Sequence, residues 1–138
     1  MKQKAKEHQW VETGYVIGFM TNKGVVLDLD NMTYRSAKRL TVNLCRKYKL
    51  EGYLLIRSSE KSYHVVFNRY LSWRKITEIV FSQYEVLRWA VMQMRYSALT
   101  IRVSKKNGEN KPKILLKVGK QDKLIKEYME IYETFEDY

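Results

Sequence analysis

Cysteine, proline and long apolar runs are nearly absent from this sequence. Cys45 and Pro112 are the single cysteine and proline among 138 residues. One cysteine cannot form a disulfide framework and favours a reducing, cytoplasmic setting. One cysteine and two histidines also make a structural zinc site very unfavourable. No apolar run approaches the roughly 20 residues of a membrane span, and the polar segment 1–9 does not fit a secretory signal.

Acidic residues are scarce relative to basic ones. The chain has 26 lysines and arginines against 15 aspartates and glutamates, a formal net charge of +11. Such a surplus favours polyanions, namely nucleic acid, nucleotides or an acidic membrane surface. Nine basic residues lie between Arg102 and Lys126, where only Glu109 and Asp122 oppose them. A basic edge of this kind can follow a nucleic-acid strand. The candidate nucleic-acid-binding residues are Lys106, Lys111, Lys113, Lys117 and Lys120.

The spacing of apolar residues predicts a single α+β domain over 1–138, with residues 1–10 flexible. Residues 25–104 follow the order strand–helix–strand–strand–helix–strand, which is typical of the ferredoxin-like or RRM-like βαββαβ fold. An extra N-terminal strand precedes this core, and a C-terminal strand and helix follow it. In such a fold we expect helices on one sheet face and an open face on the other. The predicted strands are 14–20, 25–30, 53–59, 62–67, 99–104 and 114–118, and the predicted helices are 34–48, 73–95 with a break near 82, and one capped by Asp122 that runs to about 135.

Two aspartates interrupt the apolar strand 25–30. Because strand side chains alternate, Asp28 and Asp30 point to one face while Leu27 and Leu29 point to the other. Two carboxylates about 7 Å apart can hold a hard cation such as Mg²⁺. The other interpretation is a strand end whose acids simply face water, and the short motif alone does not separate the two.

A second polar motif, Ser58-Ser-Glu-Lys-Ser-Tyr-His64, lies in a predicted hairpin with a tight turn at Glu60-Lys61. Alternation places His64 on the face opposite the apolar stripe of Tyr63 and Val65. This favours a functional face around His64. The other interpretations are an ordinary surface histidine or a histidine capped in the core.

Together, the two motifs resemble those of the archaeo-eukaryotic primase superfamily. That family carries Asp-x-Asp on a strand, followed by a hairpin of the form Ser-Gly-x-x-Gly-Tyr-His. Here Ser59 and Ser62 stand where glycines are common, and the similarity covers residues 25–69. The resemblance implies that Asp28 and Asp30 bind Mg²⁺ or Mn²⁺, and that Ser58 and His64 hold a nucleotide triphosphate. It also implies the catalytic set Asp28, Asp30 and His64, with Arg102 and Lys105 near the phosphates.

The resemblance implies a primase- or polymerase-like replication protein of a replicon. Its partners would be nucleoside triphosphates and DNA or RNA, single-stranded or as a primer–template. The family usually supplies a third acidic residue on a later strand, and none is found here. The alternative is therefore a catalytically inactive RRM-like nucleic-acid-binding protein. A partner-binding domain that docks through its acidic last helix also stays open, whereas His8 and His64 are too far apart for a rolling-circle nuclease motif.

Overall fold

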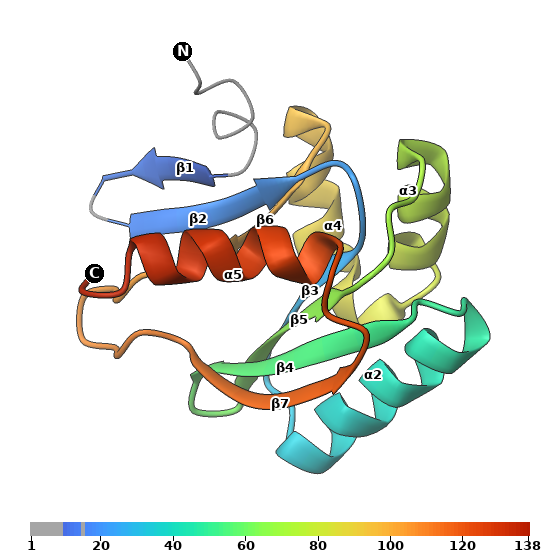
Figure 1. Ribbon diagram of the computed structural model, residues 1–138, viewed down its shortest axis with the longest axis horizontal. Helices are drawn as coiled ribbons and strands as arrows, with labels where there is room; N and C mark the ends of the chain where they lie inside the picture. The colour runs from blue at the N-terminus through green and yellow to red at the C-terminus, as the bar shows by residue number, and fades with distance from the viewer. Residues whose placement is uncertain (1–9, 15) are drawn as a thin grey trace.

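The computed structural model describes residues 10–14 and 16–138 (Figure 1). Of the predicted flexible segment 1–10, which includes His8, only Trp10 is among the described residues. Tyr15 also lies outside them. The strands are β1 (Trp10–Thr13), β2 (Val16–Thr21), β3 (Val26–Leu29), β4 (Gly52–Ser59), β5 (Ser62–Phe67), β6 (Leu99–Arg102) and β7 (Lys113–Gly119). The helices are α2 (Tyr34–Lys47), α3 (Trp73–Phe81), α4 (Leu87–Gln93) and α5 (Leu124–Thr134), with 3-10 turns η1 (Tyr84–Val86) and η2 (Met94–Tyr96).

The strands form two antiparallel sheets with the orders β1-β2-β6 and β3-β5-β4-β7. This mixed architecture is consistent with the predicted α+β class. The prediction that β3 and β5 are neighbours is confirmed. A ferredoxin-like core would also place β6 in a ladder beside β3, but β6 pairs with β2 instead. β3 and β6 still contact each other at the junction of the two sheets.

Helix α2 begins and ends as its sequence predicts. The Thr33 side chain caps it by accepting a hydrogen bond of 3.1 Å from the Ser36 N–H. Ala37, Leu40 and Leu44 are buried against the sheet, which is the apolar face that helical spacing predicts. At the other end, the Arg69 guanidinium donates to the carbonyl oxygens of the two residues after the helix. These contacts satisfy carbonyl groups that have no partner within the helix.

The predicted long helix 73–95 is divided near Ser82, as expected. α3 ends at Phe81, and the Ser82 hydroxyl donates to the Ile79 carbonyl at 2.6 Å. The turn η1 then leads into the short helix α4. This division lets the chain change direction and bury Val86 and Ala90 in the core.

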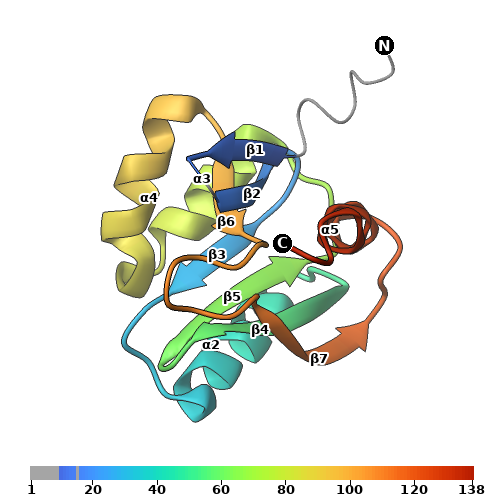
Figure 2. The same cartoon turned by 90° about the vertical axis from the view of Figure 1, so that its left-hand side faces the viewer.

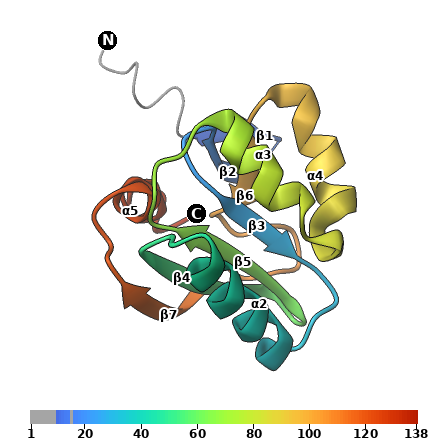
Figure 3. The same cartoon turned by 90° about the vertical axis from the view of Figure 1, so that its right-hand side faces the viewer.

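Helices cover both faces of the four-stranded sheet. α2 packs against β4 and β5 on one side, and α5 packs against β5 and β2 on the other (Figures 2 and 3). The buried residues of α5 are Leu124, Ile125, Tyr128 and Ile131. The expectation that one sheet face stays open is therefore wrong. The apolar stripe of α5 needs a surface to bury it, and the sheet face supplies that surface.

A buried asparagine holds the start of α5. Asn68 follows β5, and its Oδ1 accepts hydrogen bonds from the N–H groups of Lys123 (2.8 Å) and Ile125 (3.2 Å). Its Nδ2 donates to Asp122 Oδ1 at 3.0 Å. The sequence predicts Asp122 as the cap. Instead, Asp122 orients Asn68, and that hydrogen bond lowers the pKa of the Asp122 carboxyl.

Replacement of Asn68 should therefore destabilise the whole domain. Asn68→Ala removes both acceptor contacts to α5 and leaves buried N–H groups unsatisfied, so the free energy of unfolding should fall by about 2–3 kcal/mol. Urea denaturation measures this loss. Asn43→Ala on the exposed side of α2 is the control and should change stability by less than about 1 kcal/mol. Equal effects of the two substitutions would mean that Asn68 does not anchor α5.

Candidate functional site

Predicted site residues from four different strands, β3, β4, β5 and β6, surround one pocket of about 330 Å³. Asp28 of β3 and His64 of β5 are direct partners in the antiparallel ladder, so their side chains leave the sheet on the same face. Asp28 Oδ1 lies 3.6 Å from His64 Nε2. Asp30, Ser58 and Arg102 also line this pocket. The structure thus brings together residues that are up to 74 positions apart in the sequence.

The Asp28 carboxyl lies in an unfavourable environment for a negative charge. Its side chain is 26% exposed. Burial raises the pKa of Asp28 to about 7, and the negative charge of Asp30 adds to this effect. The positive charges of Lys106 and Arg102 oppose it. Asp28 therefore exchanges its proton near neutral pH. A cation bound between the two acids would favour the ionised form of both.

His64 is buried and neutral. Its side chain is only 4% exposed, and burial lowers its pKa to about 3, with the positive charge of Arg102 as a further cause. Its Nδ1 atom has no hydrogen-bond partner within the described residues. Buried polar atoms without partners are rare in folded proteins and call for an explanation such as a bound ligand or water. Neutral imidazole offers one donor and one acceptor nitrogen.

Arg102 links the two sheets at the rim of the pocket. Its guanidinium donates to the backbone carbonyl oxygens of Ser58 (2.7 Å) and Asn110 (3.2 Å) and to that of Ser104. It also lies 3.5 Å from Glu109 Oε1. Burial lowers the pKa of Arg102. The ordinary pKa of arginine is so high that the group still keeps its charge at neutral pH. Arg102 is thus held rigidly by several carbonyl groups while its charge stays beside the two acids.

Lys106, and not Lys105, is the lysine that lines the pocket. The side chain of Lys105 is exposed to solvent, and its backbone N–H donates to the carbonyl of Tyr138. Lys106 forms an ion pair of 3.4 Å with Glu109. Strand alternation cannot predict which of Lys105 and Lys106 points to the pocket. Both residues follow the end of β6, where the strand period no longer applies.

Sequence reasoning missed Glu109, a third carboxylate that lines the same pocket. It lies in the loop between β6 and β7, where no periodicity predicts the direction of a side chain. Its carboxylate faces Arg102 and Lys106 and is thus already neutralised. The excess of basic residues in 102–126 also favoured the interpretation of this segment as a nucleic-acid-binding edge. Glu109 was therefore not predicted to line the pocket.

The lysines predicted to bind nucleic acid lie in different environments. Lys111 donates from Nζ to the carbonyl oxygens of Tyr132 (3.1 Å) and Phe135 (2.8 Å) at the end of α5. That lysine therefore holds the C-terminal segment against the domain. The exposed lysines of β7 and the turn after it are Lys113, Lys117 and Lys120.

The two aspartates are the ligands that a divalent cation would find here. In residues 10–14 and 16–138, no group of three or more histidine, cysteine or acidic side chains is arranged to hold a metal ion. A cation would take Asp28 and Asp30 from the protein and fill its other positions with water or phosphate oxygens, which suits Mg²⁺. The crowding of negative charge that raises the pKa of Asp28 fits such a cation.

Comparisons with protein-family models, with curated proteins and with solved structures found no match for this chain. No helix in the described part of the chain is both long and apolar enough to cross a membrane.

The buried Asp28 and His64 should make stability depend on pH in opposite directions. In the unfolded chain Asp28 ionises near pH 3.8, but in the folded protein it does so near 7. Its burial therefore lowers the free energy of unfolding as the pH rises from about 4 to 7. His64 takes up a proton near pH 6.5 when unfolded but only near 3 when folded. Its burial lowers the free energy of unfolding as the pH falls from about 6.5 to 3.

Asp28→Asn separates the two effects. The variant should be more stable than the wild type at pH values above about 7, by up to roughly 4 kcal/mol, and nearly equal to it near pH 4. Thermal and urea denaturation across this pH range measure the difference. Asp137→Asn, a change of an exposed acid near the C-terminus, is the control and should follow the wild-type curve. If Asp28→Asn also follows that curve, the carboxyl is not buried beside Asp30.

Proposed function

We propose that this pocket binds a divalent cation and the triphosphate of a nucleotide, and that the protein is a primase-like replication protein acting on DNA or RNA. The observation that supports this most is the arrangement of charge. Two carboxylates, Asp28 and Asp30, share a small pocket with the cations Arg102 and Lys106. Carboxylates can hold a metal ion while adjacent cations contact the phosphates that bind it.

The topology supports the same proposal. The neighbours β3, β5 and β4, with β6 in contact with β3, correspond to a ferredoxin-like βαββαβ core in which the β6–β3 ladder is open. Such a core carries the two motifs on adjacent strands, as the primase-like resemblance implies. In this interpretation β1 and β2 extend one edge of the core, and β7 and α5 extend the other edge and one face.

Each pocket residue has a distinct proposed role. Asp28 and Asp30 hold Mg²⁺ or Mn²⁺, which when bound neutralises the triphosphate and assists attack by a 3′-hydroxyl. His64 donates one hydrogen bond from its neutral ring to a phosphate oxygen, which would satisfy a ring nitrogen. Ser58 lies beside it on β4, and Arg102 supplies a fixed positive charge. Lys106 takes the place that the sequence assigned to Lys105.

A catalytically inactive binding protein is the second candidate function. The observation that favours it is the position of Glu109, whose carboxylate faces Arg102 and Lys106 and not a metal site. With two free carboxylates, one cation can bind together with a nucleotide. Nucleotidyl transfer often needs a second metal ion to assist the attacking hydroxyl. Binding without transfer is the outcome that this arrangement would produce.

Calorimetry with Mn²⁺ and a nucleoside triphosphate tests the pocket. The wild type should release or absorb heat on binding, and at a ligand concentration 100 times Kd its stability should rise by about 2.7 kcal/mol. Asp28→Asn combined with Asp30→Asn should remove both effects and stay folded. Glu60→Gln combined with Asp137→Asn removes the same formal charge from exposed positions and is the control. Identical heats for the wild type and the pocket variant would show that the two acids bind no cation.

A primer-extension assay with labelled nucleotides separates the two candidate functions. Incorporation that depends on Mn²⁺ and disappears in the Asp28→Asn, Asp30→Asn variant would support nucleotidyl transfer. Normal binding in calorimetry together with no incorporation on any template would support the inactive binding protein.

A further inference from the structure

We propose that the outer face of α2 binds the phosphate backbone of nucleic acid. The proposal rests on the proposed function only for the class of partner, because α2 lies outside the pocket. No acidic residue occurs between Asp30 and Glu51. All of the cations in this segment are exposed. They are Arg35, Lys38, Arg39, Arg46, Lys47 and Lys49.

These cations are not compensated by the protein itself. Within the described residues, none of the six forms an ion pair with an acid. Some lysines elsewhere form ion pairs, as Lys106 does with Glu109 and Lys123 with Glu51. The positive potential along α2 is therefore available to a polyanion.

Helix stability does not account for the position of these charges. Cations favour the last turn of a helix and disfavour the first, because of the helix dipole. Arg46 and Lys47 lie in the last turn, where they stabilise α2. Arg35 lies in the first turn, which contains no acid, and Lys38 and Arg39 follow it. A binding role explains cations at positions where the helix alone would favour acids.

Three arginines form a stripe on the side of α2 that faces away from the sheet. Arg35, Arg39 and Arg46 fall within about 40° of one another at about 100° per residue, and they span roughly 16 Å at 1.5 Å per residue. The opposite side of the helix is buried through Ala37 and Leu44. A nucleic-acid strand carries a charge every 3.4 Å or so along the duplex axis, so several phosphates can lie along this stripe.

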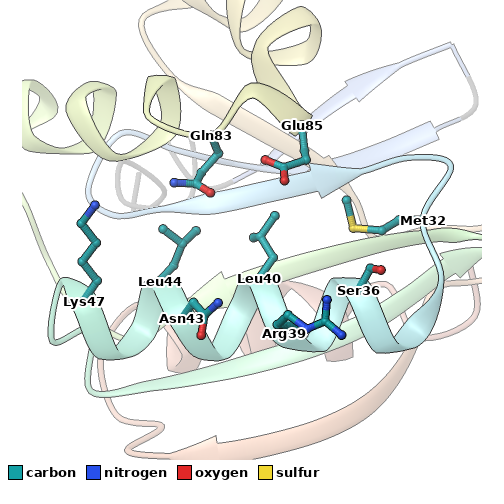
Figure 4. A pocket seen from close by; sticks show the side chains of 9 residues that line it. All are labelled: Met32, Ser36, Arg39, Leu40, Asn43, Leu44, Lys47, Gln83 and Glu85. Atoms are coloured by element: carbon teal, nitrogen blue, oxygen red, sulfur yellow. The ribbon is translucent and has the colours of Figure 1, made fainter.

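Polar groups beside the stripe can contact sugar and phosphate oxygens. A groove of about 290 Å³ separates α2 from η1, with Leu40 and Leu44 pointing into it (Figure 4). Asn43 and Lys47 line it on the helix side, and Gln83 lies across from them. Its other lining residues are Met32, Ser36, Arg39 and Glu85. The acid lies on the η1 side of the groove, so phosphates would follow the α2 side.

The stripe and the proposed nucleotide pocket lie on different faces of the four-stranded sheet. Tyr34 of α2 packs against Tyr63 on one face, whereas Asp28 and His64 leave the sheet on the other face. α2 begins four residues after Asp30, so its first turn lies near the end of β3. The acidic helix α5 lies on the other side of the sheet (Figures 2 and 3), where its exposed glutamates would repel nucleic acid.

An anionic membrane is a less suitable partner for this face. Membrane-bound amphipathic helices insert large apolar side chains beside their cations. Among the residues of α2, Tyr34 is the exposed large apolar side chain, with 37% exposure. The buried side of α2 already packs on the sheet and is unavailable for insertion. Phosphate contacts along a strand require only the outward cations.

Fluorescence anisotropy with labelled oligonucleotides tests the proposal. Arg35→Gln, Arg39→Gln and Arg46→Gln are combined in one variant, since glutamine preserves helix propensity. Single-stranded DNA and duplex DNA are titrated separately at several salt concentrations. The variant should bind at least about tenfold more weakly, and the slope of log affinity against log salt should decrease by about 2 for a single strand, because about three phosphate contacts are lost. The preferred oligonucleotide identifies the form of the partner.

Two matched variants control for net charge. Arg74→Gln, Arg88→Gln and Arg95→Gln remove three exposed arginines from the α3–α4 region and should change the affinity less than about threefold. Lys113→Gln, Lys117→Gln and Lys120→Gln test the edge strand β7 and should lose less affinity than the α2 variant. Equal losses in all three variants, or a larger loss in the β7 variant, would overturn the proposal. So would wild-type binding only to vesicles rich in phosphatidylserine, or no binding to either oligonucleotide.

The outcome for α2 is distinguishable from that for the pocket. The α2 variant should retain the wild-type heats with Mn²⁺ and nucleoside triphosphate, whereas the Asp28→Asn, Asp30→Asn variant should retain binding to the oligonucleotide. Oligonucleotide binding that disappears only in the pocket variant would overturn the assignment to α2. Melting curves of all variants confirm that each is folded.

Discussion

The pairing of β3 with β5 is the constraint on which the rest of this structure depends. Its register puts Asp28 opposite His64 and leaves Leu27 and Leu29 buried on the other face. A shift by one residue would exchange the two faces of β3. The acids would then enter the apolar core under the helices, and the leucines would line the pocket. Hydrophobic burial thus maintains the geometry of the polar site.

The pocket is polar because the sheet face that carries it is closed by more than one element. α5 covers part of this face, and the loop after β6 brings Lys106 and Glu109 to its rim. Arg102 joins β6 to the carbonyl of Ser58 on β4, across the junction where the two sheets have no ladder. The resulting enclosure is what desolvates Asp28 and His64. An open RRM-like face would have left both groups in water with ordinary pKa values.

Charge is distributed unevenly around the domain. The basic helix α2 and the acidic helix α5 lie on opposite sides of the four-stranded sheet (Figures 2 and 3). An overall surplus of positive charge would attract polyanions to the whole surface without direction, but this separation gives the domain a preferred orientation toward them. The pocket lies on the face of the sheet opposite α2. Nucleic acid on α2 and a nucleotide in the pocket would therefore not compete for the same residues.

The sequence by itself determined most of the local structure and the partial composition of the pocket. Alternation places Asp28 and His64 on the faces opposite their apolar neighbours, and helical spacing defines α2 and the division near Ser82, because these patterns depend on neighbouring residues. Tertiary structure alone decided that α5 covers the sheet and that Asn68 holds the first turn of α5. It also decided that Lys111 binds the end of α5, and that Lys106 and Glu109 complete the pocket. Each of these depends on contacts between residues in loops or far apart in the sequence, where neither period 2 nor period 3.6 gives the direction of a side chain.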